Sequence, residues 1–184
     1  IKCPSLAYHL LGTKKIQQVM ALPGVIEHYL AGSENAESKL VRSCFTGLYS
    51  LDDNEHDNAI IQDAINNSYN YVLKPQREGG GNLIHGNEMC EILKHITPVD
   101  REKYILMKRI EPKSFKSYLV REGTVTEGDV ICELGIFGAF IGDEKETYLN
   151  ENAGYLLRTK LAHVEDGGVA AGVAFLDSIA VVDQ

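Results

Sequence analysis

A lysine, an arginine and a glutamate surround three consecutive glycines near the middle of this 184-residue chain. The stretch runs from Lys74 to Asn82 and follows an apolar run, which predicts a strand that ends in a glycine-rich loop. Glycine loses more conformational freedom on ordering than any other residue, so three in a row suit a loop that must approach a ligand closely. Cations and backbone N–H groups bind phosphate, and a carboxylate binds Mg²⁺. The stretch therefore predicts a phosphate cover with a metal ligand beside it.

Two common phosphate loops do not fit this arrangement. A Walker A loop places its lysine after the glycines, whereas Lys74 precedes them. The dinucleotide-binding fingerprint needs a G-x-G-x-x-G spacing, which this run of three glycines does not supply. A glycine run alone could equally be an exposed turn. The flanking charges, and a second glycine-rich segment at 166–172, favour the nucleotide site.

The elements that must position this loop are predicted to be a helical leader and an α+β body with antiparallel strands. Helices are expected over 5–30, with breaks at Gly12 and Pro23, and then over 37–48, 60–65 and 87–96. Strands are expected over 69–73, 104–110, 117–120 and 130–141, followed by a hairpin turn at 143–145 and returning strands at 147–149 and 154–159. Asn87 is expected to cap its helix. The acidic run 51–58 is expected to be a solvated connection.

Composition argues against several functional classes. The net charge of -8 does not suit a nucleic-acid or membrane-surface binder, and no apolar run approaches the roughly 20 residues that span a bilayer. The four cysteines, Cys3, Cys44, Cys90 and Cys132, have neither a zinc-site spacing nor a dense disulfide pattern. A reduced, cytoplasmic protein is expected, without a signal peptide. Because the chain starts at Ile1, we also expect it to be part of something longer.

The stretch at 74–82 resembles the glycine-rich loop of the eukaryotic glutathione synthetases, members of the ATP-grasp superfamily. Further segments resemble this family in the same order and at similar spacing, namely 12–15, 47–51, 104–107, 110–112, 133–138, 156–160 and 166–172. The resemblance covers nearly the whole chain. It implies the C-terminal part of an ATP-grasp fold, in which an antiparallel sheet has flanking helices and a Gly-rich lid loop. Residues 1–47 would then be the C-terminal end of the substrate-binding domain, and 48–184 the ATP-binding region.

The reaction that this resemblance implies is ATP + γ-glutamylcysteine + glycine → glutathione + ADP + phosphate. The cysteinyl carboxylate would attack the γ-phosphate to give an acyl phosphate, which the glycine amine would then displace. No protein nucleophile is required, because catalysis is positioning and neutralisation of charge. The small side chains of Ala170 and Ala171 favour glycine as the acceptor. Mg²⁺ is the implied cofactor, and a homodimer is the implied assembly.

The resemblance also implies roles for individual residues. The implied ATP-binding residues are Lys14, Lys74, Pro75, Gln76, Arg77, Glu78, Gly79, Gly80, Gly81, Asn82, Met107, Lys108, Arg109, Ile110, Glu133, Lys160 and Asp166. Among them, Glu78 is the implied magnesium ligand, and 107–110 is the strand that lines the adenine pocket. Arg158 is the implied ligand of the peptide carboxylate and, with Lys74, a catalytic residue. Val169 and Ala170 are the implied substrate contacts.

The chain departs from the family at two positions of the loop and in its length. Leu83 and His85 stand where an asparagine and a tyrosine are usual, so those two roles are not assigned here. The family's chains are more than twice as long, and their N-terminal portion would supply the other magnesium ligands. The isolated chain is therefore expected to be an incomplete enzyme. Two alternatives stay open, namely another ATP-grasp carboxylate–amine ligase and a non-catalytic nucleotide-binding fragment.

Overall fold

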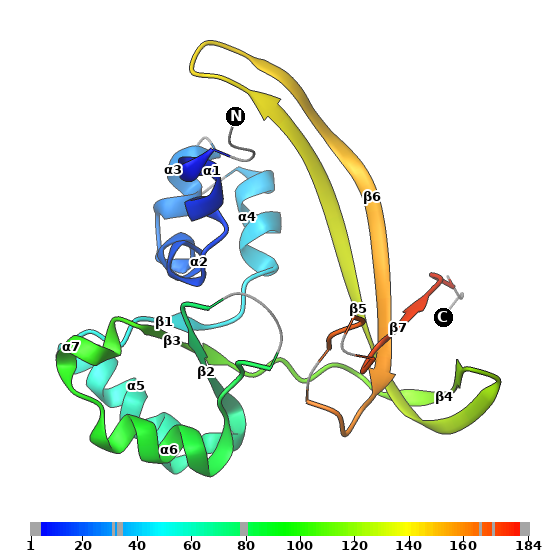
Figure 1. Cartoon of the computed structure of the whole chain (residues 1–184). Helices are drawn as coiled ribbons and strands as arrows, with labels where there is room; N and C mark the ends of the chain where they lie inside the picture. The colour runs from blue at the N-terminus through cyan, green and yellow to red at the C-terminus, as the bar shows by residue number, and fades with distance from the viewer. Residues whose placement is uncertain are drawn as a thin grey trace. The chain divides into compact units, whose positions relative to one another are not determined.

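The computed structural model describes residues 5–30, 32, 35–77, 81–165, 167–170 and 172–180. The chain divides into two compact units, Ile1–Ile110 and Glu111–Gln184, each of which has its own antiparallel sheet (Figure 1). The predicted α+β class, with antiparallel sheets and flanking helices, is confirmed. The boundary expected at residue 47 concerns the domains of the longer family proteins and stays a prediction. Within the described residues, no helix is both long and apolar enough to cross a membrane.

Four short helices open the first unit. They are α1 (Leu6–Leu11), α2 (Lys14–Ala21), α3 (Val25–Tyr29) and α4 (Ala36–Ser43). The breaks expected at Gly12 and Pro23 separate the first three of these helices. Ser5 begins α1, because its side chain accepts a hydrogen bond from the backbone of the first turn.

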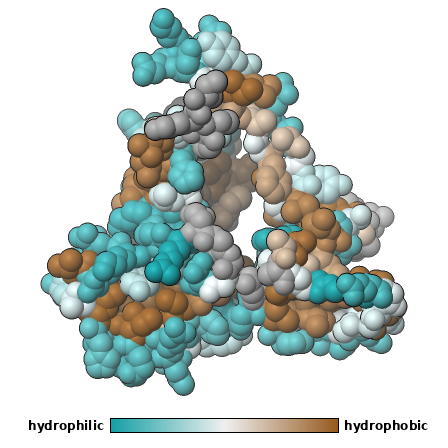
Figure 2. All heavy atoms as spheres, viewed as in Figure 1, coloured by the Kyte–Doolittle hydropathy of each residue, from teal (hydrophilic) through white to brown (hydrophobic). Residues whose placement is uncertain are grey.

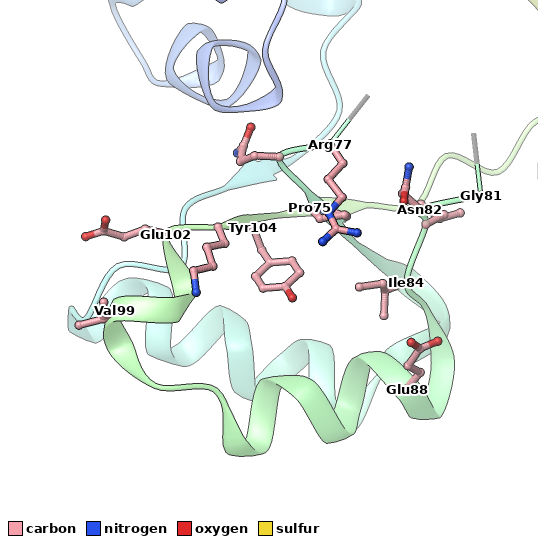
Figure 3. A pocket seen from close by; sticks show the side chains of 12 residues that line it. Pro75, Arg77, Gly81, Asn82, Ile84, Glu88, Val99, Glu102 and Tyr104 are labelled. Carbon is pink, nitrogen blue, oxygen red and sulfur yellow. The ribbon is translucent and has the colours of Figure 1, made fainter. Parts of the chain in front are cut away.

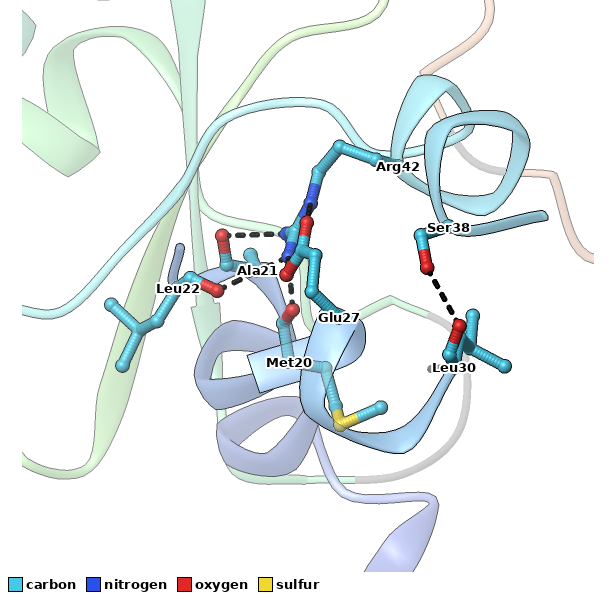
Figure 4. A network of polar contacts seen from close by, with 7 residues as sticks. All are labelled: Met20, Ala21, Leu22, Glu27, Leu30, Ser38 and Arg42. Carbon is cyan, nitrogen blue, oxygen red and sulfur yellow. Dashed lines mark hydrogen bonds and ion pairs between the residues drawn. The ribbon is translucent and has the colours of Figure 1, made fainter. Parts of the chain in front are cut away.

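Arg42 on α4 holds this helical leader together (Figure 4). Its guanidinium donates to both carboxylate oxygens of Glu27, at 2.9 and 2.6 Å. It also donates to the carbonyls of Met20, Ala21 and Leu22, which end α2 without an intrahelical partner. The hydrogen bonds from Arg42 lower the pKa of Glu27 to about 2. One side chain therefore ties α2, α3 and α4.

The prediction for α4 is wrong in length and in the buried face. The helix ends at Ser43 rather than near residue 48, and Leu40 of its expected apolar face is 69% exposed. The buried residue is Ser38, whose hydroxyl donates to the Leu30 carbonyl at 3.1 Å. Ser38 and Arg42 lie one turn apart on the same face, so polar anchors decide which face packs against the bundle.

A three-stranded sheet and two helices follow in the first unit. The strands are β1 (Leu48–Tyr49), β2 (Tyr71–Pro75) and β3 (Tyr104–Lys108), in the order β1-β3-β2. The helices are α5 (Glu55–Asn66) and α6 (Gly86–His95), joined to the sheet by η1 (Ser68–Asn70) and α7 (Pro98–Arg101). One core fills the space between sheet and helices, formed by Leu51, Ile61, Ala64, Tyr71, Leu73, Met89, Leu93 and Leu106. The strand ends that border the glycine-rich loop are thus fixed by packing.

One expectation for the helices of this sheet is partly right and one is wrong. Residues 52–56 of the acidic run are exposed, as expected for a solvated connection, but α5 begins within the run, because Asn54 caps the helix and the Asp57 carboxylate is buried in its first turn. Asp57 accepts hydrogen bonds from the Ser50 hydroxyl at 2.7 Å and from the Asn54 amide at 2.8 Å. Asn87 does not cap α6 but lies inside it, since the extended His85 is the N-cap residue. The helix starts earlier than predicted because the chain leaves its pairing with β2 at Ile84.

The second unit is a four-stranded antiparallel sheet built around a long hairpin. Its strands are β4 (Phe115–Arg121), β5 (Thr124–Gly142), β6 (Thr147–Leu161) and β7 (Phe175–Asp177), in that order. The hairpin turn expected at 143–145 is confirmed, because the Asp143 carboxylate accepts from the backbone N–H groups of Lys145 and Glu146. The two returning strands that were expected are one continuous strand, β6, and β5 begins before Val130.

The β5–β6 hairpin carries large apolar side chains that this chain leaves exposed. Leu134, Ile136, Phe137 and Tyr155 are all more than half exposed, and brown surface follows the two strands in Figure 2. Apolar surface of this extent is typical of a face that packs against further protein.

Candidate functional site

Leu73 and Ile84 close the base of the glycine-rich loop. The Leu73 N–H donates to the Ile84 carbonyl at 2.8 Å, and the Ile84 N–H donates to the Leu73 carbonyl at 3.1 Å. Leu73 is fully buried in the core, so both ends of the loop start from a fixed point. Gly81, with φ +77°, adopts a conformation that favours glycine. The predicted residues Glu78, Gly79 and Gly80 lie outside the described residues.

Lys74 and Met107 lie on the sheet face that points away from α5 and α6. Leu73 and Leu106 belong to the core on the helix side, and successive side chains of a strand alternate between faces. Lys74 is paired with Ile105 on the neighbouring strand. Met107 lies two residues beyond Ile105, which corresponds to roughly 7 Å along that strand. The structure therefore brings together a cation and an apolar side chain that were both predicted to contact ATP.

The first turn of α2 reaches the segment that follows β2. The Lys14 ammonium donates to the carbonyl oxygen of Arg77, and the Lys15 backbone N–H donates to the Gln76 side chain at 3.3 Å. Three predicted ATP-binding residues from distant parts of the sequence, Lys14, Gln76 and Arg77, are therefore neighbours. This contact links the helical leader to the start of the glycine-rich loop.

The end of β3 contributes mainly backbone contacts. The Lys108 N–H donates to the carbonyl of Gly47 at 2.8 Å, which continues the pairing with β1. The Arg109 guanidinium lies 4.7 Å from the centre of the Tyr69 ring. Ile110 is largely exposed. Of the four residues predicted to line an adenine pocket, Met107 and Lys108 lie in β3, and of these two Met107 lies on the face of Lys74.

A cavity of about 900 Å³ opens behind the loop, on the helix side of the sheet (Figure 3). The Arg77 guanidinium and the Tyr104 ring point into it, and Glu88 borders it from α6. Among the described residues, the cavity is lined by Pro75, Gln76, Arg77, Gly81, Asn82, Leu83, Ile84, Glu88, Val99, Glu102, Lys103 and Tyr104. The predicted residues Lys74 and Arg77 therefore direct their side chains to opposite faces of the sheet.

Glu133, Arg158 and Lys160 form an ion cluster in the second unit. Glu133 lies on β5 directly opposite Arg158 on β6, and Arg158 donates to its carboxylate at 2.6 Å. The Lys160 ammonium lies 3.5 Å from the other carboxylate oxygen and donates to the Glu165 carbonyl at 3.1 Å. Lys160 is buried, whereas Glu133 and Arg158 are partly exposed. The three residues were predicted separately, and the structure places them in one cluster.

The predicted substrate contacts Val169 and Ala170 lie in a compact turn after this cluster. The Gly172 N–H donates to the Val169 carbonyl at 2.9 Å. Sequence reasoning missed Arg121 of β4, whose guanidinium donates to the carbonyls of Gly172 and Ala174 and so supports the turn. No local motif marks Arg121, because only the folded sheet brings β4 close to this turn. Asp166 and Ala171 lie outside the described residues.

Metal-binding geometry is not found in the part of the chain that the structure describes. No group of three or more His, Cys, Asp or Glu side chains there could hold a metal ion. The implied magnesium ligand, Glu78, falls outside that part. Its carboxylate is of the oxygen-donor type that Mg²⁺ prefers, and nucleotide phosphates commonly supply the remaining ligands.

Comparisons with known proteins match nearly the whole chain. Residues 5–181 match the family described as eukaryotic glutathione synthase, ATP binding domain. The chloroplastic glutathione synthetase of Arabidopsis thaliana is 48% identical over an alignment of 185 positions, which covers 99% of this chain and 33% of that protein. The glutathione synthetase of Homo sapiens is 47% identical over 179 residues, 96% of this chain and 38% of that protein.

The fold of this chain is also similar to that of a solved structure. A glutathione synthetase-like effector from Globodera pallida, in its apo form, superposes with a TM-score of 0.68 at 26% identity. The superposition covers 97% of this chain and 36% of the effector. The chain thus spans about a third of the length of the curated relatives that it matches.

Proposed function

Because this chain belongs to the eukaryotic glutathione synthetase family and has its α+β fold of ATP-grasp type, we propose that it forms the ATP-binding part of a ligase that joins γ-glutamylcysteine to glycine. The products are glutathione, ADP and phosphate. The observation that supports this most is the ion cluster of Glu133, Arg158 and Lys160 on paired strands. It offers two cations of different chemistry beside one carboxylate.

Arg158 and Lys160 suit different parts of the reactants. A planar guanidinium binds a carboxylate through two parallel hydrogen bonds, so Arg158 suits the cysteinyl carboxylate of the peptide. An ammonium is a compact charge that suits phosphate, so Lys160 and Lys74 suit ATP. The substrate carboxylate attacks the γ-phosphorus, ADP leaves, and the glycine amine then displaces phosphate from the acyl carbon. The protein positions the reactants and neutralises charge.

Magnesium is the proposed cofactor, held by Glu78 together with phosphate oxygens of ATP. When bound, it would neutralise charge on the phosphates. Lys74, which lies four residues before Glu78 in the sequence, is a second cation proposed for the phosphates. Loss of magnesium should therefore weaken nucleotide binding even in the absence of the peptide substrate.

The proposal extends to assembly and location. A homodimer is proposed for the complete protein, and sedimentation at several protein concentrations would test it. A cytoplasmic location is proposed because the cysteines in the described part of the chain, Cys44, Cys90 and Cys132, are free thiols. Two relatives are named chloroplastic, so location differs within the family and needs direct imaging of the tagged protein.

Turnover is proposed to require more than these 184 residues, because they match only about a third of each relative. The test supplies MgATP, γ-glutamylcysteine and glycine to the full-length protein and measures ADP and glutathione. We expect equal amounts of both products, loss of ADP formation in Lys74→Ala, and normal rates in Lys94→Ala, whose side chain is exposed on α6. Glutathione formation by residues 1–184 alone would contradict this requirement.

The same assay distinguishes the proposed function from the two alternative functions. An amino-acid panel in place of glycine identifies a different carboxylate–amine ligase, because ADP release would then follow another acceptor. A non-catalytic nucleotide-binding protein would bind ATP without releasing ADP under any of these conditions.

A further inference from the structure

The backbone at Gly167 lies directly against the Glu133 carboxylate. A Cβ atom at Gly167 would lie 3.1 Å from one carboxylate oxygen of Glu133 and 3.3 Å from the other. Both distances are tighter than those of nine in ten real Cβ contacts. A Cβ atom at position 167 would therefore require the carboxylate or the loop to shift by a few tenths of an ångström.

The carboxylate that Gly167 touches is already shared between two cations. One oxygen accepts from Arg158 at 2.6 Å, and the other faces the Lys160 ammonium at 3.5 Å. Lys160 also donates to the carbonyl of Glu165, at the base of the same loop. Glu133 thus contacts both Arg158 and Lys160, and Lys160 in turn is bonded to the base of the loop.

We propose that Gly167 is a positioning residue for the ligase reaction. Because position 167 has no side chain, the backbone of Gly167 can pack against Glu133. This packing fixes the Glu133 carboxylate between Arg158 and Lys160. The carboxylate in turn orients the guanidinium that receives the peptide's carboxylate. This inference deepens the proposed function and rests on it, since the role of Arg158 is part of that function.

A methyl group at position 167 should act through this contact. It requires the Glu133 carboxylate to give way by a few tenths of an ångström, which disturbs its alignment with Arg158 and its approach to the buried Lys160. Arg158 then keeps its charge, but its guanidinium group loses the carboxylate that orients it. Gly138 on β5 offers a matched control, because a Cβ there would lie 3.8 Å from its nearest neighbour, the Glu151 carbonyl, an ordinary contact.

A double-mutant cycle in the full-length protein tests the proposal. The four proteins are wild type, Gly167→Ala, Glu133→Ala and the double variant, with Gly138→Ala as the control. Gly167→Ala should raise KM for γ-glutamylcysteine about tenfold, as expected for one disturbed hydrogen bond to a charged group, with a smaller change in kcat. Gly138→Ala should stay within about twofold of wild type in both constants, because Gly138 is exposed. A folding defect would instead lower kcat at unchanged KM.

The decisive comparison is made in the Glu133→Ala background. If Gly167 acts through the carboxylate, adding Gly167→Ala there should change KM by less than about twofold. An equal tenfold rise in both backgrounds would overturn the proposal, as would a wild-type KM in Gly167→Ala.

The same cycle measured by thermal unfolding, without substrates, separates this inference from the proposed function. Gly167→Ala should lower the unfolding midpoint when Glu133 is present and leave it unchanged when Glu133 is alanine. An inactive wild-type protein would refute the proposed function, whereas additive unfolding midpoints would refute the contact between Gly167 and Glu133.

Discussion

Replacing Ile84 by proline should open the base of the glycine-rich loop. The Ile84 N–H donates to the carbonyl of the fully buried Leu73 at 3.1 Å. Proline has no N–H, so this carbonyl loses its partner, and a buried acceptor without a partner costs about 1–3 kcal/mol. We expect the free energy of unfolding of the first unit to fall by that amount. If loop closure and ATP binding are coupled, ATP affinity falls by about fivefold to 140-fold.

Ile84→Val is the control, because it keeps the N–H and removes only one methylene group. Chemical denaturation gives the free energy of unfolding, and calorimetry with MgATP gives the affinity. An Ile84→Pro protein that binds ATP as tightly as Ile84→Val would refute the reasoning, since the bridge to Leu73 would then have no part in positioning the loop.

Three further predictions follow from single contacts. Asp57→Ala should lower the free energy of unfolding by about 1.5–3 kcal/mol in chemical denaturation, because this buried carboxylate accepts two side-chain hydrogen bonds, whereas the exposed Asp53→Ala should have little effect. Glu27 has its pKa lowered from 4.5 to about 2, so its contribution to stability is complete above pH 4.5 and is lost as the pH falls toward 2. In Arg42→Met, the midpoint of thermal unfolding should depend less on pH over that window than it does in the wild type. Arg158→Lys should raise KM for γ-glutamylcysteine about tenfold in steady-state kinetics, because lysine keeps the charge but lacks the planar fork.

Local signals in the sequence were enough to predict most of the elements. The breaks at Gly12 and Pro23 and the turn at Asp143 follow from chain stiffness and turn chemistry, which depend on a few adjacent residues. The buried face of α4 could not be predicted in this way. There, Ser38 and Arg42 gain hydrogen bonds to backbone carbonyls of other helices, and this outweighs the apolar pattern of the helix itself.

The ion cluster shows why site residues were found singly and their contacts were missed. Counting nine residues back from Gly142 and nine forward from its partner Thr147 would pair Glu133 with Leu156. The observed partner is Arg158, because the register shifts once between Ile141 and Gly142 and once between Phe137 and Gly138. Each irregularity adds one residue to β6. One of them lies at 152–154, where Gly154 has a φ of +115° and its N–H donates to the Asn152 side chain, a detail that the alternation of apolar and polar residues does not reveal.

Transfer of oxygen from the peptide to phosphate tests the central claim most directly. The full-length protein would receive MgATP, glycine and γ-glutamylcysteine labelled with ¹⁸O in its cysteinyl carboxylate, and mass spectrometry would measure the label in the released phosphate. Attack of that carboxylate on the γ-phosphorus predicts one ¹⁸O atom per phosphate, formed together with glutathione. Phosphate without label, or ATP hydrolysis that does not depend on the peptide, would contradict the assignment of this chain to a glutathione-forming ligase.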